Sequence, residues 1–281
     1  MASVTGSLIS VIIPALNEEA TLGQTLDQFD RLAGRWEVIV ADSGSDDRTV
    51  EIAREAGAIV VEAAPAGRGL AMNAGVERAR GDVLLFLHAD TLLPEHAHDL
   101  IVNELADPAV AANGFRLRMD RDEWRYCLLS PISVLRFRVQ RTFFGDQAIA
   151  VGRRDFDALG GYREPVLMED VELSRRIRKR GELRLLPAYV TTSARRFERD
   201  GVFRTLLLMS LFQAAYAIGV SADCLANWYR HARSAPEPAP ETVENIELAE
   251  LELRDECDRQ VDLAANGQHG PVLLVFLRWL G

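Results

Sequence analysis

Three apolar runs of the sequence end in side chains that can bind a charged ligand. The run "DVLLFLHADTLLP", residues 82–94, reaches His88 and Asp90, and two earlier runs end in Glu18 and Asp42. Carboxylates are the ligands that hard divalent cations prefer, and an imidazole can bond to ribose or phosphate oxygens. Each acid alone could instead cap the following helix. Three such run ends in one sequence favour a shared binding site.

Between residues 8 and 87, short apolar runs alternate with stretches of helical periodicity. The runs "LISVIIPAL", "WEVIVAD", "AIVVEA" and "DVLLFLHAD" are typical of strands covered on both faces. Helical patterns follow "NEEA" and fill "DDRTVEIAREAG" and "GLAMNAGVERARG". The alternation predicts right-handed βαβ units and a mainly parallel sheet flanked by helices. Ligands bind such sheets at the carboxyl ends of the strands, where the polar residues stand.

Beyond residue 94 the pattern is less regular. "HDLIVNELADP" predicts a helix and "AVAANGFRLRMD" a strand, whereas "GDQAIAVGRRDFDALGGYRE" indicates a short strand, a helix and a glycine-rich turn. "EDVELSRRIRKRG" predicts a helix that buries Val171, Leu173 and Ile177. Glu169 and Asp170 begin this helix, where negative charge complements the helix dipole.

Composition excludes several classes of protein. The 281 residues are 48% hydrophobic, which is enough for a sizeable core, and carry a net charge of −10, which argues against a nucleic-acid ligand. The cysteines, Cys127, Cys224 and Cys257, show no metal-binding spacing and favour a reducing cytoplasm. The first apolar run meets acidic residues too soon for a signal peptide. We therefore expect a cytoplasmic protein.

Five motifs occur in a recognisable order. With "VIIPALNEE", "VADSGSDDRT", "GRGLAMNAG", "LFLHAD" and "MEDVELSRRIRKRG", residues 8–196 resemble the family 2 inverting glycosyltransferases of the GT-A fold. The chain looks nearest to a bacterial branch with "LHAD" in place of Asp-x-Asp. The resemblance implies a Rossmann-like sheet, a nucleotide-diphosphate sugar donor that we expect to be UDP-linked, an unidentified acceptor hydroxyl and Mn²⁺ or Mg²⁺.

The resemblance also assigns the donor site. Asp90 matches the second Asp of Asp-x-Asp and is expected to bind the metal. His88 stands at the first Asp and would either ligate the metal or contact ribose or diphosphate. Asp42 matches the aspartate that reads uracil. The full set expected at the nucleotide is Pro14, Ala15, Glu18, Asp42, Arg68, Asn73 and His88.

The same resemblance assigns the catalytic and acceptor residues. Asp170 matches the general base of an inverting transfer, and Glu169 would orient it or bind the acceptor. "FFGDQAIAV" matches an acceptor loop with Gly145, Asp146 and Gln147. Many relatives have a histidine after the base helix, which this chain lacks. Arg195 and Arg196 could hold the diphosphate instead, or could form a solvated basic face.

The C-terminal region is expected to extend the fold. We expect a GT-A domain over 1–200, an apolar helical segment over 201–233, and a Pro-rich linker with an acidic helical tail over 234–281. Residues 205–222 carry no charge but are a poor match to a membrane span. They suggest peripheral contact with the inner face of a membrane, and the tail could mediate a homodimer.

Two rival functions remain open on the sequence. A nucleotidyltransferase acting on sugar phosphates also has a Rossmann-like sheet with metal-binding acids. Its glycine- and lysine-rich phosphate loop is missing here, where "PALNEE" follows the first strand. A catalytically inactive nucleotide-sugar binding protein is the second rival, and the presence of both Asp90 and Asp170 weighs against it.

Overall fold

The structure is a computed structural model and describes residues 6–63, 67–163, 168–221, 224–226, 228, 253–254 and 260–261. The chain divides into two compact units, residues 1–229 and 230–281. The elements from β1 to α10 all belong to the first unit. Residues 201–221 thus lie in the first unit, and the expected boundaries at residues 200 and 233 stay predictions.

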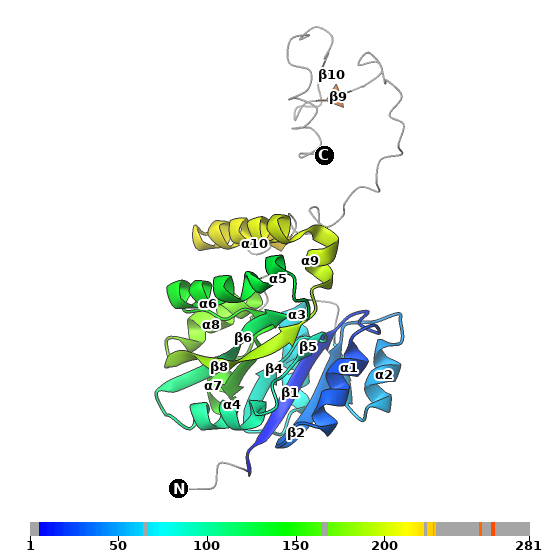
Figure 1. The fold of residues 1–281 in the computed structure, drawn as a ribbon, viewed down its shortest axis with the longest axis vertical. Coiled ribbons are helices and arrows are strands. Elements are labelled where there is room, and N and C mark those ends of the chain that lie inside the picture. Colours follow the sequence, from blue (N-terminus) through cyan, green and yellow to red (C-terminus); the bar gives the residue numbers. More distant parts are fainter. Residues whose placement is uncertain are drawn as a thin grey trace. The chain divides into compact units, whose positions relative to one another are not determined.

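The first unit is built on an eight-stranded sheet in the order β3-β2-β1-β4-β7-β6-β8-β5 (Figure 1). The strands are β1 (Leu8–Ala15), β2 (Arg35–Asp42), β3 (Ile59–Glu62), β4 (Val83–Phe86), β5 (Thr91–Leu92), β6 (Val110–Met119), β7 (Ile149–Gly152) and β8 (Glu182–Thr192). The four strands from β3 to β4 are parallel, as the alternation predicted. The expected α/β fold is confirmed.

Antiparallel pairs make the second half of the sheet mixed. β7 pairs antiparallel with β4 and β6, and β5 pairs antiparallel with β8. The parallel pairing of β6 with β8 contains two register shifts. Residues 110–192 lack the regular strand and helix alternation, and this is why the sequence did not predict their pairing.

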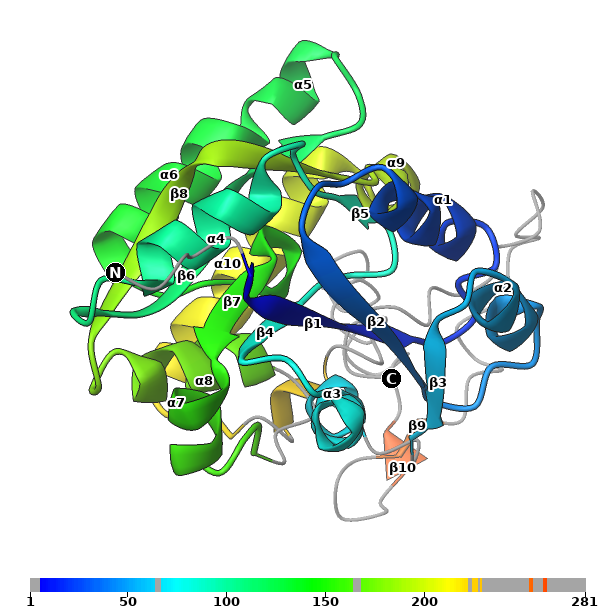
Figure 2. The ribbon, with the colours of Figure 1, turned by 90° about the horizontal axis from the view of Figure 1, so that it is seen from below.

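Helices cover both faces of the sheet. They are α1 (Leu22–Asp27), α2 (Thr49–Glu55), α3 (Arg68–Arg78), α4 (Ala97–Leu105), α5 (Trp124–Cys127), α6 (Leu129–Gln140), α7 (Arg153–Ala158), α8 (Glu169–Ile177), α9 (Arg195–Asp200) and α10 (Val202–Ala217), with the short 3-10 turns η2 (Gln28–Asp30) and η3 (Gly145–Gln147). Figure 2 shows α1, α2 and α4 on one face and α3, α7 and α8 on the other.

The strand sequences explain the two layers. In β1, Ile9, Val11 and Ile13 are fully buried and pack with Leu22 of α1. Ile12, which points the other way, belongs to the core beneath α3 and α8. Successive side chains of a strand alternate between faces, so a continuous apolar run feeds both cores at once.

The tail departs from the expectation in one respect. Leu253–Arg254 (β9) and Gln260–Val261 (β10), inside the expected acidic helix, form a two-stranded antiparallel ladder instead. The segment "ELELR" alternates apolar and charged residues with the period of a strand, and this local pattern competes with the helical one. The expected Pro-rich linker and the expected dimer contact of the tail lie outside the described residues.

The apolar segment after α9 forms the helix α10. The described part of the chain contains no helix of the length and apolarity that a membrane crossing requires.

Candidate active site

The sheet brings the three polar run ends to one edge. Ala15 at the end of β1 is in register with Asp42 at the end of β2, and the Leu87 amide donates to Ile12 of β1 at 3.0 Å. The first residues beyond β1, β2 and β4 are therefore neighbours. This arrangement places Glu18, Asp42, His88 and Asp90 at the carboxyl edge, as expected for a parallel sheet.

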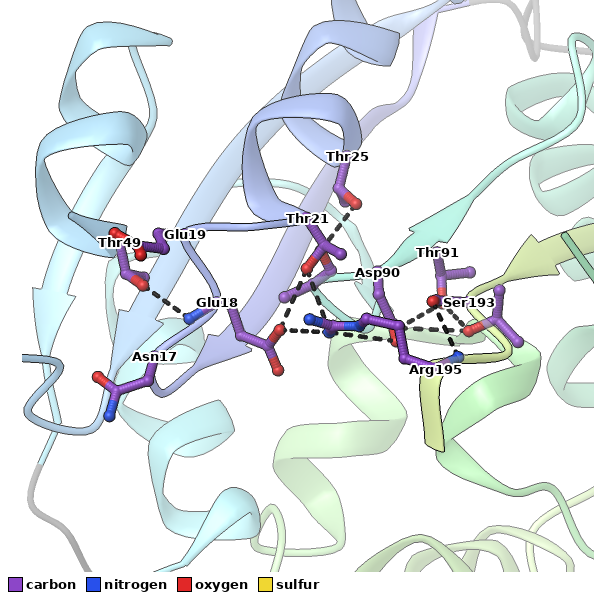
Figure 3. Close-up of polar contacts among 12 residues, drawn as sticks. Asn17, Glu18, Glu19, Thr21, Thr25, Thr49, Asp90, Thr91, Ser193 and Arg195 are labelled. Carbon is purple, nitrogen blue, oxygen red and sulfur yellow. Dashed lines mark hydrogen bonds and ion pairs between the residues drawn. The ribbon is translucent and has the colours of Figure 1, made fainter. Parts of the chain in front are cut away.

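Figure 3 shows Glu18, Asp90 and Arg195 close together, and with Thr192 they form a group that we call the Asp90 cluster. Arg195 Nη2 donates to Glu18 Oε2 at 2.8 Å and lies 3.9 Å from Asp90 Oδ2. The Thr192 hydroxyl donates to Asp90 Oδ1 at 3.2 Å. One guanidinium thus holds two acids from different strand ends, and the Arg195 side chain is 45% exposed.

Burial and a like charge act on Asp90. Desolvation raises the pKa of the Asp90 carboxyl, and the nearby Glu18 carboxylate raises it further, while Arg195 and the Thr192 hydroxyl lower it. A positive ion at this position would stabilise the charged form of Asp90, because it offsets both unfavourable effects.

Hydrogen bonds join the loops that follow β1 and β2. The Asp42 carboxylate is buried and accepts the Gly44 and Ser45 amides, both at 3.0 Å, so it closes the turn after β2. The Glu18 amide donates to the Thr49 hydroxyl at 2.8 Å. Asp42 Oδ1 also accepts the Ser45 hydroxyl. A carboxylate has about four acceptor positions, so one remains for a ligand on Asp42.

A second group, the Asp170 cluster, contains Arg68, Arg136, Asp146, Glu169 and Asp170. Asp170 lies in the first turn of α8, and its carboxylate accepts the Gly145 amide at 2.6 Å and its neighbour's amide, Val171, at 2.7 Å. Arg68 Nη1 lies 3.4 Å from Glu169 Oε1. Two backbone donors therefore fix the orientation of Asp170.

The carboxyl groups of the Asp170 cluster have raised pKa values, which favour their neutral forms. Burial raises the pKa of Glu169 to about 7, and the negative charge of Asp170 adds to the shift while Arg68 opposes it. Burial also raises the pKa of Asp170, against the Gly145 amide, Arg68 and Arg136, which lower it. Because two neighbouring carboxylates repel each other when both are charged, the cluster holds a proton more readily than free carboxylates do.

Arg136 and Asp146 were not expected to meet at this position. Burial raises the pKa of Asp146 and lowers that of Arg136, and each side chain's charge offsets part of the shift on the other. Asp146 Oδ1 and Arg136 Nε are buried and have no hydrogen-bond partner among the described residues. The Arg136 guanidinium lies 3.4 Å from the centre of the Phe144 ring. No protein group in the described part of the chain therefore satisfies these two atoms.

His88 faces the Asp170 cluster. A side chain at Gly145 would place its Cβ 2.5 Å from His88 Nε2 and 3.6 Å from Asp170 Oδ2, so only glycine fits between them. His88 Nε2 is buried and unpartnered among the described residues. Burial, with the charges of Arg68 and Arg196, lowers the pKa of His88 to about 3, so the imidazole is neutral at neutral pH.

Several expected site residues have protein partners. Asn73 Nδ2 donates to the Tyr162 carbonyl at 2.8 Å and Asn73 Oδ1 accepts the Tyr162 amide at 2.9 Å, so this side chain ties α3 to the glycine turn. Gln147 is buried and bonds to the backbone of Phe144 and Phe115. Pro14 and Ala15 end β1.

The acids at this edge suit a divalent cation that also binds a ligand. Asp90 offers a carboxylate whose charge a cation would stabilise, with Glu18 beside it. Within the described ranges, no three His, Cys, Asp or Glu side chains converge into a complete cage. A cation held by Asp90 would therefore take its remaining ligands from a bound molecule and water.

The sequence did not predict two residues of these clusters, Thr192 and Arg136. Thr192 ends β8, and the β5–β8 pairing brings it to Asp90. Arg136 lies on α6, a helix with apolar residues on most sides, where one arginine has no distinguishing pattern. The contact of α6 with β6 decides its position, and sequence spacing does not encode that contact.

Comparison with known proteins identifies similar chains. A family model described as Glycosyl transferase family 2 matches residues 10–160. The glucosyl-3-phosphoglycerate synthase of Mycolicibacterium paratuberculosis is 36% identical over 126 residues, which cover 41% of this chain and 37% of that protein. The match thus spans well under half of that relative's length.

Two solved structures share the fold. A mannosyltransferase from Pyrobaculum calidifontis, in complex with GDP-Man and Mn²⁺, has a TM-score of 0.54 at 21% identity over 81% of this chain and 80% of that one. A glucosyl-3-phosphoglycerate synthase from Mycobacterium tuberculosis, in complex with Mn²⁺, UDP-Glc and phosphoglyceric acid, has a TM-score of 0.50 at 24% identity, over 66% and 72%.

Proposed function

The chain belongs to glycosyl transferase family 2, and on this premise we propose that it transfers a sugar from a nucleotide-diphosphate sugar to an acceptor hydroxyl with inversion. The observation that carries the proposal is the placement of Asp170. Its buried carboxylate is oriented by the Gly145 and Val171 amides, and Gly145 also touches His88, which shares the end of β4 with Asp90. The carboxylate that we propose as the base therefore lies near the end of β4, where we propose that the metal and the diphosphate bind.

In the proposed reaction, the acceptor oxygen bonds to the anomeric carbon as the bond to the diphosphate oxygen breaks. The hydroxyl proton passes to Asp170, whose raised pKa makes it a better proton acceptor than an ordinary aspartate. The Gly145 amide holds Asp170 Oδ2 in place and leaves a second lone pair on that oxygen for the acceptor. Asp146, Gln147 and Glu169 belong to the acceptor side.

Asp90 is the proposed ligand of Mn²⁺ or Mg²⁺, and His88 is either a second ligand or a contact to ribose or diphosphate. A bound divalent cation neutralises charge on the leaving diphosphate. Both structural neighbours were solved with Mn²⁺, which supports this assignment. Arg195 and Arg196, at the start of α9, would pair with the diphosphate.

The donor nucleotide is proposed to be UDP-linked. The support is the resemblance of Asp42 to a uracil-reading aspartate and the UDP-Glc bound to one neighbour. The other neighbour binds GDP-Man, so the base needs its own test. Pro14, Ala15, Glu18 and Arg68 would complete the nucleotide contacts. We place the reaction in the cytoplasm because no cysteine spacing indicates an oxidising compartment.

A thermal-shift screen tests the donor. UDP, GDP, ADP and CDP are compared with Mn²⁺, with Mg²⁺ and without metal, because a ligand that binds only the native state raises the melting temperature. UDP with Mn²⁺ should give the largest shift. Equal shifts with all four nucleotides would remove the uridine assignment.

Turnover is measured separately on the nucleotide sugar that binds best, with water and a panel of added alcohols and sugars as acceptors and release of the nucleoside diphosphate as the readout. Release that depends on Asp170 supports an enzyme. Binding without any release, under conditions in which a known family 2 enzyme is active, would favour an inactive nucleotide-sugar binding protein.

A further inference from the structure

The first unit exposes an unusual amount of apolar surface on two helical segments. The described residues expose thirteen large apolar side chains, and ten of them lie in residues 124–139 and 203–228. Contiguous apolar surface on a soluble domain marks contact with another molecule or a membrane. The remaining three, Leu16, Ile59 and Tyr189, are isolated.

The two segments repeat one spacing. α5 and α6, joined through Leu128, expose Trp124, Leu128, Ile132, Leu135 and Val139. α10 and its end expose Phe203, Leu207, Leu211 and Ile218, with Ala214 between the last two. Offsets of 0, 4, 8, 11 and 15 residues lie on one side of a helix, so each helix turns an apolar stripe to solvent. Val139 is 75% exposed and Ile218 84%.

The exposed stripes are not the sides of the helices that pack against the core. Leu129, Ser133 and Phe137 of α6 are buried, as are Val202, Thr205 and Phe212 of α10. Each helix thus already packs one side against the unit. The outward sides of ordinary surface helices are polar. The exposed stripes therefore have a role other than packing within the first unit.

The two helices adjoin. Gln140 Nε2 at the end of α6 lies 3.4 Å from Gln213 Oε1 of α10, and Arg175 of α8 lies 4.9 Å from the centre of the Tyr216 ring of α10. Figure 1 shows α10 above α5 and α6 at the same end of the unit. We call α5, α6 and α10 with their exposed side chains the apolar face.

The charge of the apolar face is opposite to that of the protein. Residues 124–141 contain four arginines and no acid, and residues 201–221 contain Arg204 and no acid, whereas the whole chain carries −10. Arg125, Arg138, Arg141 and Arg204 are exposed. Arginines beside exposed Trp, Phe and Leu are typical of helices that lie in an anionic lipid interface.

We propose that the apolar face docks the protein on an anionic membrane surface. Charge selects this occupant over a second copy, because a copy would bring the same arginines together. The stripes supply buried area, and the arginines contact lipid phosphates. This binding is independent of the proposed sugar transfer and needs neither nucleotide nor metal.

Sedimentation of the full chain with vesicles tests the proposal. We expect binding to vesicles of phosphatidylglycerol and phosphatidylcholine, weaker binding at high salt, and little binding to phosphatidylcholine alone. Leu135→Ser combined with Leu207→Ser should weaken binding about tenfold or more, since two exposed leucines lose their burial in the interface. Arg138→Gln with Arg141→Gln should weaken binding only to the anionic vesicles.

Matched variants outside the apolar face control for general effects. Ile59→Ser and Arg54→Gln remove an exposed isoleucine of β3 and an exposed arginine of α2, and should leave vesicle binding unchanged. Circular dichroism melting confirms that each variant is folded, and the nucleotide shift is recorded separately.

Three outcomes would overturn the proposal. The full chain fails to bind anionic vesicles, or the Leu135→Ser and Leu207→Ser pair binds as well as the parent. A concentration-dependent dimer that this pair dissociates, with no vesicle binding, would assign the face to a second copy.

Discussion

The Asp90 cluster and the Asp170 cluster stand at the same sheet edge but differ in how their charges are satisfied. In the Asp90 cluster, Arg195 bridges two acids and is 45% exposed. In the Asp170 cluster the acids are buried, and Asp146 Oδ1 lacks a partner among the described residues. Burial raises the pKa of one acid of the first cluster, Asp90, and of the acids of the second. The half-exposed Arg195 can exchange its carboxylate partners for an incoming charged ligand at low cost. The first cluster suits ligand binding and the second suits proton transfer.

The largest expected effect comes from removing the base. Asp170→Asn keeps the shape and the Val171 contact of the side chain but removes the oxygen that accepts the proton, so turnover should fall about 100-fold or more. Donor affinity should change little, because the Asp90 cluster is untouched. Initial rates and donor titrations measure both quantities. Unchanged turnover would exclude Asp170 as the base.

The next effect concerns the Asp90 cluster. Asp90→Ala should abolish the enhancement of UDP binding by Mn²⁺, which we expect to be about tenfold, and leave weaker metal-free binding in place. His88→Ala should match this loss if His88 is a ligand, and should lower UDP affinity with and without Mn²⁺ if it contacts ribose or phosphate. Calorimetric titration of the three proteins decides. The same Mn²⁺ enhancement in Asp90→Ala and the parent would place the metal elsewhere.

A third test uses the pH dependence of stability. The pKa of Glu169 is raised to about 7, so the folded state holds a proton that the unfolded state loses near 4.5. The stability that this proton contributes is complete below the unfolded pKa and is lost as the pH rises through the folded one.

Between about pH 6 and pH 8 the free energy of unfolding should therefore fall by about 1 kcal/mol through this site. Glu169→Gln should reduce the decrease, since glutamine does not titrate. Urea unfolding at both pH values measures it, with Glu62→Gln on exposed β3 as the control. An equal decrease in Glu169→Gln and the parent would show that Glu169 is not the titrating group.

Sequence patterns predicted the part of the site that lies on regular elements. Asp42 ends the parallel strand β2, and Glu18 and Asp90 come shortly after β1 and β4; parallel strands align their ends whatever the loops do. Arg136 and Thr192 arrive through α6 and through the antiparallel β5–β8 pair, whose positions depend on long-range packing. The same division holds for the fold, since strands β1 to β4 were expected and the pairing of β7, β6 and β8 was not.

The smallest expected effect is on the free energy of unfolding, and it compares one arginine from each cluster. Arg195→Gln removes an arginine that is 45% exposed, and exposed ion pairs contribute about 0 to 1 kcal/mol, so the free energy of unfolding should change by less than that upper bound.

Arg136→Gln makes the same chemical change beside buried acids. It leaves Asp146 and Asp170 with less opposing charge, and their pKa values should rise further. We therefore expect the loss of stability for Arg136→Gln to grow as the pH rises from 5 to 8 and more of the buried acids become charged, and to grow less for Arg195→Gln, which opposes the raised pKa of one such acid, Asp90. Urea unfolding of both variants at the two pH values tests the contrast, and equal losses at both sites would show that burial does not distinguish the two clusters.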